Sequence, residues 1–68
     1  MNEIIFLVEP AIEGGYTAKA LGESIFTEGD DLDELRDNIK DAVDCHFDSD
    51  SKPKFIRLHL VSEEVFAS

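Results

Sequence analysis

The chain has 68 residues, with 16 acidic against 6 basic side chains and a formal net charge of −10. This length leaves room for one small domain, which we place at residues 1–68, and it excludes an active site enclosed between two domains. The six basic residues are scattered along the sequence, and an acidic chain repels phosphate backbones and anionic lipids. We therefore expect no direct nucleic-acid or membrane binding. The charge is compatible with simple solubility or with a basic partner, and both interpretations stay open.

Targeting and redox features predict a cytosolic protein. The longest apolar run, at 4–8, is far shorter than the ~20 residues of a membrane-spanning helix. Glu3 stands where a secretory signal peptide would carry basic residues. Cys45 is the only cysteine, so no disulfide bond can form within one chain.

The first predicted element is a strand over residues 2–9, because this segment is rich in β-branched and aromatic residues and is followed by Pro10. Alternation places Ile4, Phe6 and Val8 on one face. The other face carries Ile5 and Leu7 and is also apolar. A strand of this kind is covered on both sides, either by the fold or by another subunit.

A turn at Gly14–Gly15 leads into two weaker strands, over 16–21 and 23–28. Glycine supplies the positive φ that tight turns need, and Gly22 separates the two strands. These three segments predict an antiparallel meander.

A helix is predicted over residues 31–48. Asp31 is the expected N-cap, with Glu34 three residues later as in a capping box. Apolar residues recur at spacings of three and four and form one stripe. They are Leu32, Leu35, Ile39, Ala42, Val43 and Phe47. The outer face is acidic, either as a solvated surface or as a docking surface for a cationic partner.

The final predicted strand covers residues 54–61, after a polar loop that ends at Pro53. The order β-β-β-α-β predicts an α+β fold, an antiparallel sheet of three or four strands with one helix on one face. The predicted core is Phe6, Val8, Leu32, Leu35, Ile39, Val43, Phe47, Ile56, Leu58 and Leu60.

Several apolar side chains are in excess of what one helix on one sheet face would bury. They are Ile5, Leu7, Phe55, Val65 and Phe66. Self-association commonly covers such groups in small chains. We therefore predict a homodimer or a higher even oligomer with these residues at the interface.

No pattern of residues indicates catalysis, a metal or a cofactor, and we expect no enzymatic activity. Cys45 and His46 are neighbours on the predicted helix and would point about 100° apart, so they suit neither a metal site nor a nucleophilic pair. We expect Cys45 to be a half-buried structural residue. The carboxylates at 30–34 do not follow the ligand spacing of a calcium-binding loop and are better explained by helix capping.

Three segments together resemble the HicB family of antitoxins from prokaryotic toxin–antitoxin pairs. They are G-G-Y-T-A at 14–18, A-L-G-E-S at 20–24 and T-E-G-D-D-L-D-E-L-R-D-N-I-K-D-A at 27–42. The matching positions are Gly15, Tyr16, Ala18, Gly29, Asp30, Glu34, Asn38, Ile39 and Ala42. Leu35 departs from the family's usual alanine, and 20–22 replaces a proline-containing turn.

The resemblance implies the toxin-facing domain alone, with a partial RNase H-like fold. A DNA-binding domain like that of longer members is not expected in a chain that ends at Ser68, and no nuclease activity is carried over. The implied function is to bind and occlude a small basic RNA-cleaving toxin. The candidate contacts are Asp33, Asp37, Asp41 and Asp44 on the helix, with Glu28 and Asp30 at the preceding turn. The alternative is a small oligomeric protein that serves as an accessory subunit or ligand-binding module in metabolism.

Overall fold

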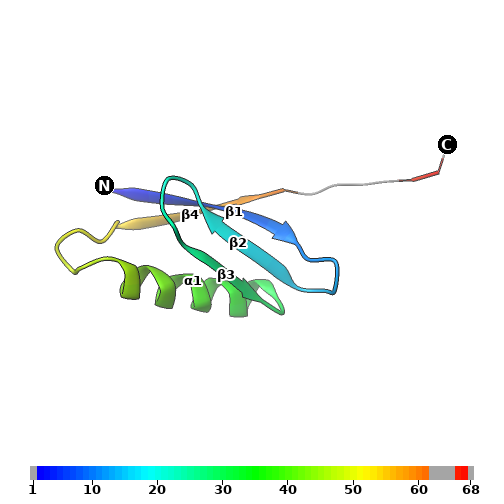
Figure 1. The fold of residues 1–68 in the computed structure, drawn as a ribbon, viewed down its shortest axis with the longest axis horizontal. Coiled ribbons are helices and arrows are strands. Elements are labelled where there is room, and N and C mark those ends of the chain that lie inside the picture. Colours follow the sequence, from blue (N-terminus) through cyan, green and yellow to red (C-terminus); the bar gives the residue numbers. More distant parts are fainter. Residues whose placement is uncertain (1, 62–65, 68) are drawn as a thin grey trace.

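The computed structural model describes residues 2–61 and 66–67 and contains four strands and one helix (Figure 1). The elements in chain order are β1 (Glu3–Pro10), β2 (Tyr16–Ala20), β3 (Phe26–Gly29), α1 (Leu32–His46) and β4 (Phe55–Leu60). The predicted α+β class and element order are confirmed. In the described residues, no helix combines the length and apolar character that crossing a membrane requires.

The four strands form one sheet in the order β3-β2-β1-β4. β2 is antiparallel to β1, and β3 is antiparallel to β2, as the predicted meander requires. β4, however, runs parallel to β1, with Ile56 beside Ile4. The prediction of a wholly antiparallel sheet was therefore wrong for this strand. The reason is that α1 carries the chain back along the sheet before β4 begins, which is the crossover that a parallel pair needs.

Side-chain contacts set the start of α1, and a change of backbone conformation ends it. The carboxylate of Asp31 accepts a hydrogen bond of 2.8 Å from the backbone N–H of Glu34. The Glu34 carboxylate in turn accepts one of 2.8 Å from the N–H of Asp30, which completes a variant of the capping box. The helix ends at His46, earlier than predicted, because Phe47 is already extended, with φ −111° and ψ 144°.

The core lies between one face of the sheet and the inner stripe of α1. The buried residues are Ile4, Phe6, Val8, Ala18, Ala20, Ile25, Leu35, Ile39 and Val43. Of the remaining predicted core residues, Leu32, Phe47, Ile56 and Leu58 are only partly buried. Leu60 is 57% exposed, so its assignment to the core was wrong. The physical reason is that α1 packs against β2 and β3, which leaves β4 at the margin of the helix.

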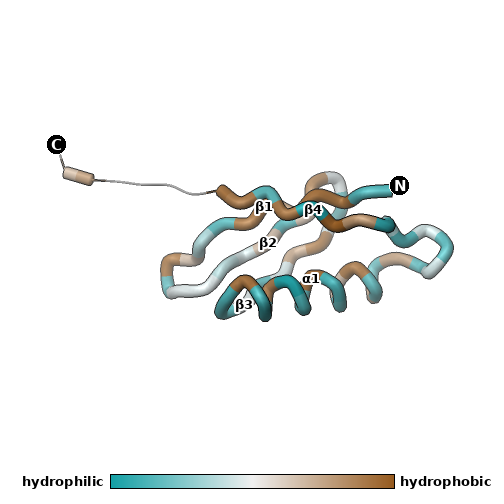
Figure 2. Tube along the Cα trace, turned by 180° about the vertical axis from the view of Figure 1, so that it is seen from behind, coloured by the Kyte–Doolittle hydropathy of each residue, from teal (hydrophilic) through white to brown (hydrophobic). Residues whose placement is uncertain are grey.

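The opposite face of the sheet is not covered by α1. Alternation along β1 and β4 places Ile5, Leu7 and Phe55 there, and Figure 2 shows apolar and hydrophilic stretches alternating along these strands. Ile5 and Leu7 are half-buried, and Phe55 is 67% exposed. Phe66 is 79% exposed, and Val65 lies outside the described residues. The predicted homo-oligomer stays a prediction.

We expect Ile39→Ala to lower the free energy of unfolding by about 2–5 kcal/mol, because its side chain is 1% exposed and its removal leaves a cavity between α1 and the sheet. Ile12→Ala is the matched control, since Ile12 is fully exposed and the same atoms are removed; we expect a change within ~0.5 kcal/mol. Urea unfolding followed by circular dichroism measures both. Equal losses for the two variants would contradict the observed packing of α1.

Candidate functional site

The outer face of α1 carries an exposed acidic stripe, which we define as Asp33, Asp37 and Asp41. A spacing of four residues keeps successive side chains on one side of a helix, about 6 Å apart along its axis. The stripe lies opposite Leu35 and Ile39, which are buried. Within the part of the chain that the structure describes, the three aspartates form no ion pair. Their predicted exposure is confirmed, and their role as partner contacts stays a prediction.

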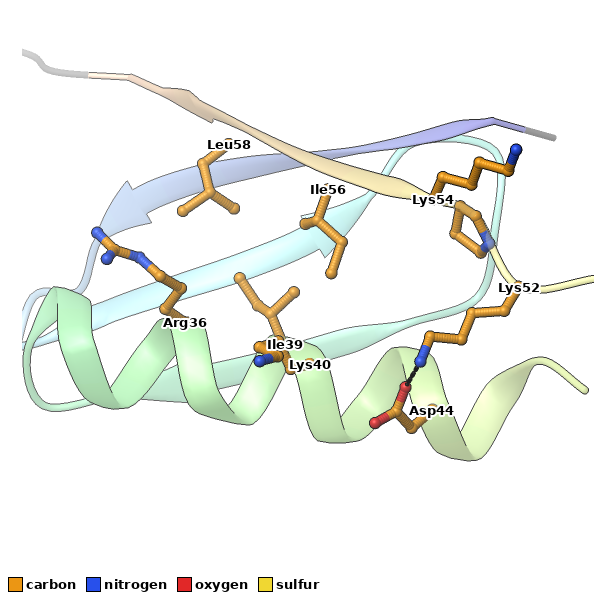
Figure 3. Close-up of a pocket in the computed structure, with 9 residues that line it drawn as sticks. Arg36, Ile39, Lys40, Asp44, Lys52, Lys54, Ile56 and Leu58 are labelled. Carbon is orange, nitrogen blue, oxygen red and sulfur yellow. Dashed lines mark ion pairs between the residues drawn. The ribbon is translucent and has the colours of Figure 1, made fainter. Parts of the chain in front are cut away.

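Asp44 differs from the other predicted helix contacts. Its carboxylate lies 2.5 Å from the ammonium of Lys52, which follows the helix in the loop before β4 (Figure 3). Both side chains are about half exposed, so the pair adds little to stability. It does offset the charge of Asp44, which is therefore less available to a basic partner than the acidic stripe.

The predicted turn contacts, Glu28 and Asp30, lie elsewhere. They line a polar hollow of about 450 Å³ near the start of α1, together with Glu34 and Asn38. The Asn38 side-chain amide donates a hydrogen bond of 2.7 Å to the Glu28 carbonyl, which ties the helix to β3. The aspartates of the acidic stripe do not line this hollow. The structure thus separates the six predicted acidic contacts into different surfaces.

Across residues 2–61 and 66–67, no three His, Cys, Asp or Glu side chains are grouped to hold a metal ion. The predicted half-burial of Cys45 was wrong, because its position on α1 faces solvent. The Nε2 atom of the neighbouring His46 lies 3.2 Å from the Glu23 carboxylate.

Two glycines of the HicB-like pattern bring three backbone segments into close contact. A Cβ atom on Gly15, whose φ is +77°, would lie 2.5 Å from the carbonyl oxygen of Gly29. A Cβ atom on Gly29 would lie 2.5 Å from the backbone nitrogen of Leu35. The β1–β2 loop, the end of β3 and the first turns of α1 therefore pack together without side chains between them. We call this contact the glycine junction.

Other positions of the same pattern also support the fold. Glu34 caps the helix, Asn38 bonds the end of β3, and Ala18 and Ile39 are buried. The residues that carry the resemblance are thus occupied in joining the β2–β3 hairpin to α1. They account for the fold and do not by themselves outline a binding site.

A groove between α1 and β4 is the feature that sequence reasoning missed. Its volume is about 420 Å³, and Ile39, Ile56 and Leu58 supply apolar side chains to it (Figure 3). Four of the chain's six basic residues line it: Arg36, Lys40, Lys52 and Lys54. The basic residues are therefore not scattered in space. One feature of the sequence could have indicated this basic lining: Arg36 and Lys40 are four residues apart, a spacing that places both on one flank of the helix.

The remaining cation near β4, Arg57, lies on the uncovered face of the sheet. Its guanidinium Nε donates a hydrogen bond to the carboxylate of Glu3 on β1. This hydrogen bond and the attraction of the Glu3 charge raise the pKa of Arg57 above its ordinary value. Arg57 is thus paired within the sheet and stays outside the groove.

Two curated relatives align with most of the chain. One from Archaeoglobus fulgidus, described as a UPF0150 protein, is 55% identical over 54 residues, which is 79% of this chain and 80% of the relative. One from Thermotoga maritima, with the same description, is 43% identical over 66 residues, 97% of this chain and 93% of the relative. No family model and no solved structure gives a significant match.

The glycine junction predicts that Gly15→Ala is more destabilising than Gly22→Ala. Both positions have positive φ, +77° and +86°, but a Cβ on Gly22 would meet nothing within 4 Å. Gly22→Ala should therefore cost only the backbone strain of about 1–2 kcal/mol. We expect Gly15→Ala to cost a further ~1–3 kcal/mol from the clash with Gly29. Urea unfolding compares the two, and equal losses would show that the junction is not tight.

Proposed function

The chain belongs to the UPF0150 family, and we propose that it is a HicB-like antitoxin, which binds and occludes a small basic RNA-cleaving toxin. The pattern of residues from Gly15 to Ala42 supports this assignment to an antitoxin type. The observation that carries the proposal is the acidic stripe on the outer face of α1, three exposed carboxylates in a row on a chain of net charge −10.

The stripe has the charge that a toxin of this kind attracts. An enzyme that cleaves RNA must draw phosphate groups to its active site, so the surface around that site is expected to be basic. Carboxylates about 6 Å apart along a rigid helix offer that surface a row of negative charges in place of phosphates. Charge complementarity would speed the encounter and favour this partner over acidic ones.

The proposed mechanism is steric. The body of the domain, held against the basic surface through α1, would cover the toxin's active site and keep RNA out. The helix is suited to contacting the toxin because its inner stripe is buried in the core. The helix is therefore fixed to the sheet, and the positions of the outer carboxylates are fixed with it. The antitoxin would supply no catalytic group, and the pair would act in the cytosol, where the RNA is.

The direct test is co-expression. The candidate toxin gene would be any short reading frame that adjoins the gene for this chain and encodes a basic protein. It would be expressed alone and then together with this chain. We expect the basic protein alone to arrest growth and the pair to restore it, and we expect the two proteins to co-purify. If this chain neither restores growth nor binds the basic protein, the antitoxin proposal is wrong, and the alternative of a small oligomeric accessory protein is favoured.

The acidic stripe predicts a specific loss in that assay. Asp37→Lys with Asp41→Lys should leave the fold intact, because both side chains are exposed on the outer face of α1. Association with the toxin should slow by ~10-fold or more at low salt, and its dependence on salt should weaken. Stopped-flow mixing or surface plasmon resonance at several salt concentrations measures the rate.

The control for this variant is Asp48→Lys with Asp50→Lys. These residues are also exposed, but they lie in the loop between α1 and β4, so the net charge changes equally while the stripe is kept. We expect the control to slow association only slightly. Equal slowing in both variants would mean that overall charge, and not the stripe, attracts the toxin.

A further inference from the structure

We propose that the groove between α1 and β4 binds the C-terminal segment, residues 62–68, of a second copy of this chain. The two copies would exchange these segments reciprocally about a two-fold axis. The proposal does not depend on the antitoxin function, because it concerns a different flank of the helix from the acidic stripe.

The groove has the chemistry of a site for an acidic and apolar segment. Its interior is apolar, formed by Ile39, Ile56 and Leu58. Basic side chains from the helix and from the following loop line it, and Asp44 is the one acidic residue that does so. Because Asp44 pairs with Lys52, the remaining cations of the groove lack a partner among the described ion pairs. A segment that carries both carboxylates and apolar side chains could pair with the basic side chains of the groove and fill its apolar interior.

The edge of β4 offers backbone groups to such an occupant. The N–H groups of Phe55 and Val61 donate toward the β1 side, to the carbonyls of Asn2, which precedes β1, and of Val8, each at 2.9 Å. Because alternate residues of a strand point in opposite directions, the N–H groups of Ile56, Leu58 and Leu60 face the free edge of the sheet. Leu60 is 57% exposed there. An apolar edge strand with unpaired backbone groups is a template for one more strand.

The C-terminal segment matches this template. Its sequence is Ser-Glu-Glu-Val-Phe-Ala-Ser, so two carboxylates precede two apolar side chains and no basic residue is present. In an extended strand Glu64 and Phe66 would fall on the same side, one to meet the basic side chains and one to fill the apolar interior. Seven extended residues span roughly 23–25 Å, enough to follow the six residues of β4, roughly 20 Å long.

A second copy is the better source of the segment than the same chain. Phe66 is 79% exposed in the single chain, so its ring does not fill the chain's own groove. The segment follows β4 directly, and pairing with its own β4 would require a reversal that consumes several of its seven residues. Exchange between two copies needs no such turn. It would also bury Phe66 and the exposed edge of β4 in both copies.

The test uses two full-length charge-reversed variants. The tail variant carries Glu63→Lys and Glu64→Lys, and the groove variant carries Arg36→Glu and Lys40→Glu. We expect wild type to sediment as a dimer at micromolar concentration, and each variant alone to dissociate with a Kd raised at least ~10-fold. Mixing the two variants should restore dimers, because each reversed tail then meets a reversed groove and each unchanged tail meets an unchanged groove.

A further variant, Phe66→Ala, removes the apolar anchor without touching the folded core, so its Kd should also rise ~10-fold while its circular dichroism stays that of wild type. A labelled peptide of residues 62–68 should bind the tail variant, whose groove is intact, more tightly than it binds the groove variant. The proposal is overturned if wild type is a monomer, if Phe66→Ala dimerises as wild type does, or if the mixed variants form no dimer containing both chains.

Discussion

The glycine junction is the contact on which the rest of this structure depends. Gly15 and Gly29 leave no side chain between the β1–β2 loop, the end of β3 and the backbone of Leu35. This contact holds the start of α1 directly against the β3 edge of the sheet. The helix then runs over β2 and β3, and its buried side chains meet Phe6 and Val8 in the middle of the sheet. One close approach of backbones thereby decides which strands the helix covers.

The same placement decides which strand stays uncovered. β4 lies at the far edge of the sheet from β3, so α1 does not close over it. Ile56 and Leu58 are consequently only partly buried, and a groove lined by basic residues remains between the strand and the flank of the helix. The groove is thus a consequence of the junction at the opposite edge.

The helix separates charge on its surface although the chain as a whole is strongly acidic. Its outer side carries the acidic stripe, and the flank toward β4 carries Arg36 and Lys40. A uniform acidic surface would only repel a second copy of the chain. A surface with its acidic and basic side chains on different sides of the helix allows self-association at the groove, and it leaves the acidic stripe available to a basic partner. The two proposals are therefore compatible on one molecule.

Short-range patterns in the sequence were enough to determine the helix, the strands, the cap at Asp31 and the exposed stripe of Asp33, Asp37 and Asp41. Each depends on residues within about one helical turn or on alternation along one strand, so the information is local. The resemblance to antitoxins likewise rests on residues such as Gly15 and Gly29, whose role is to join neighbouring elements.

Only the tertiary structure decided the direction of β4, the exposure of Leu60 and the grouping of Arg36, Lys40, Lys52 and Lys54. β4 pairs with residues about fifty positions earlier in the chain, and no local pattern records which edge it joins or in which direction. The groove likewise needs a helix and a strand that are held apart by contacts made elsewhere in the fold. A site built in this way becomes visible only after the strands and the helix have been placed relative to one another.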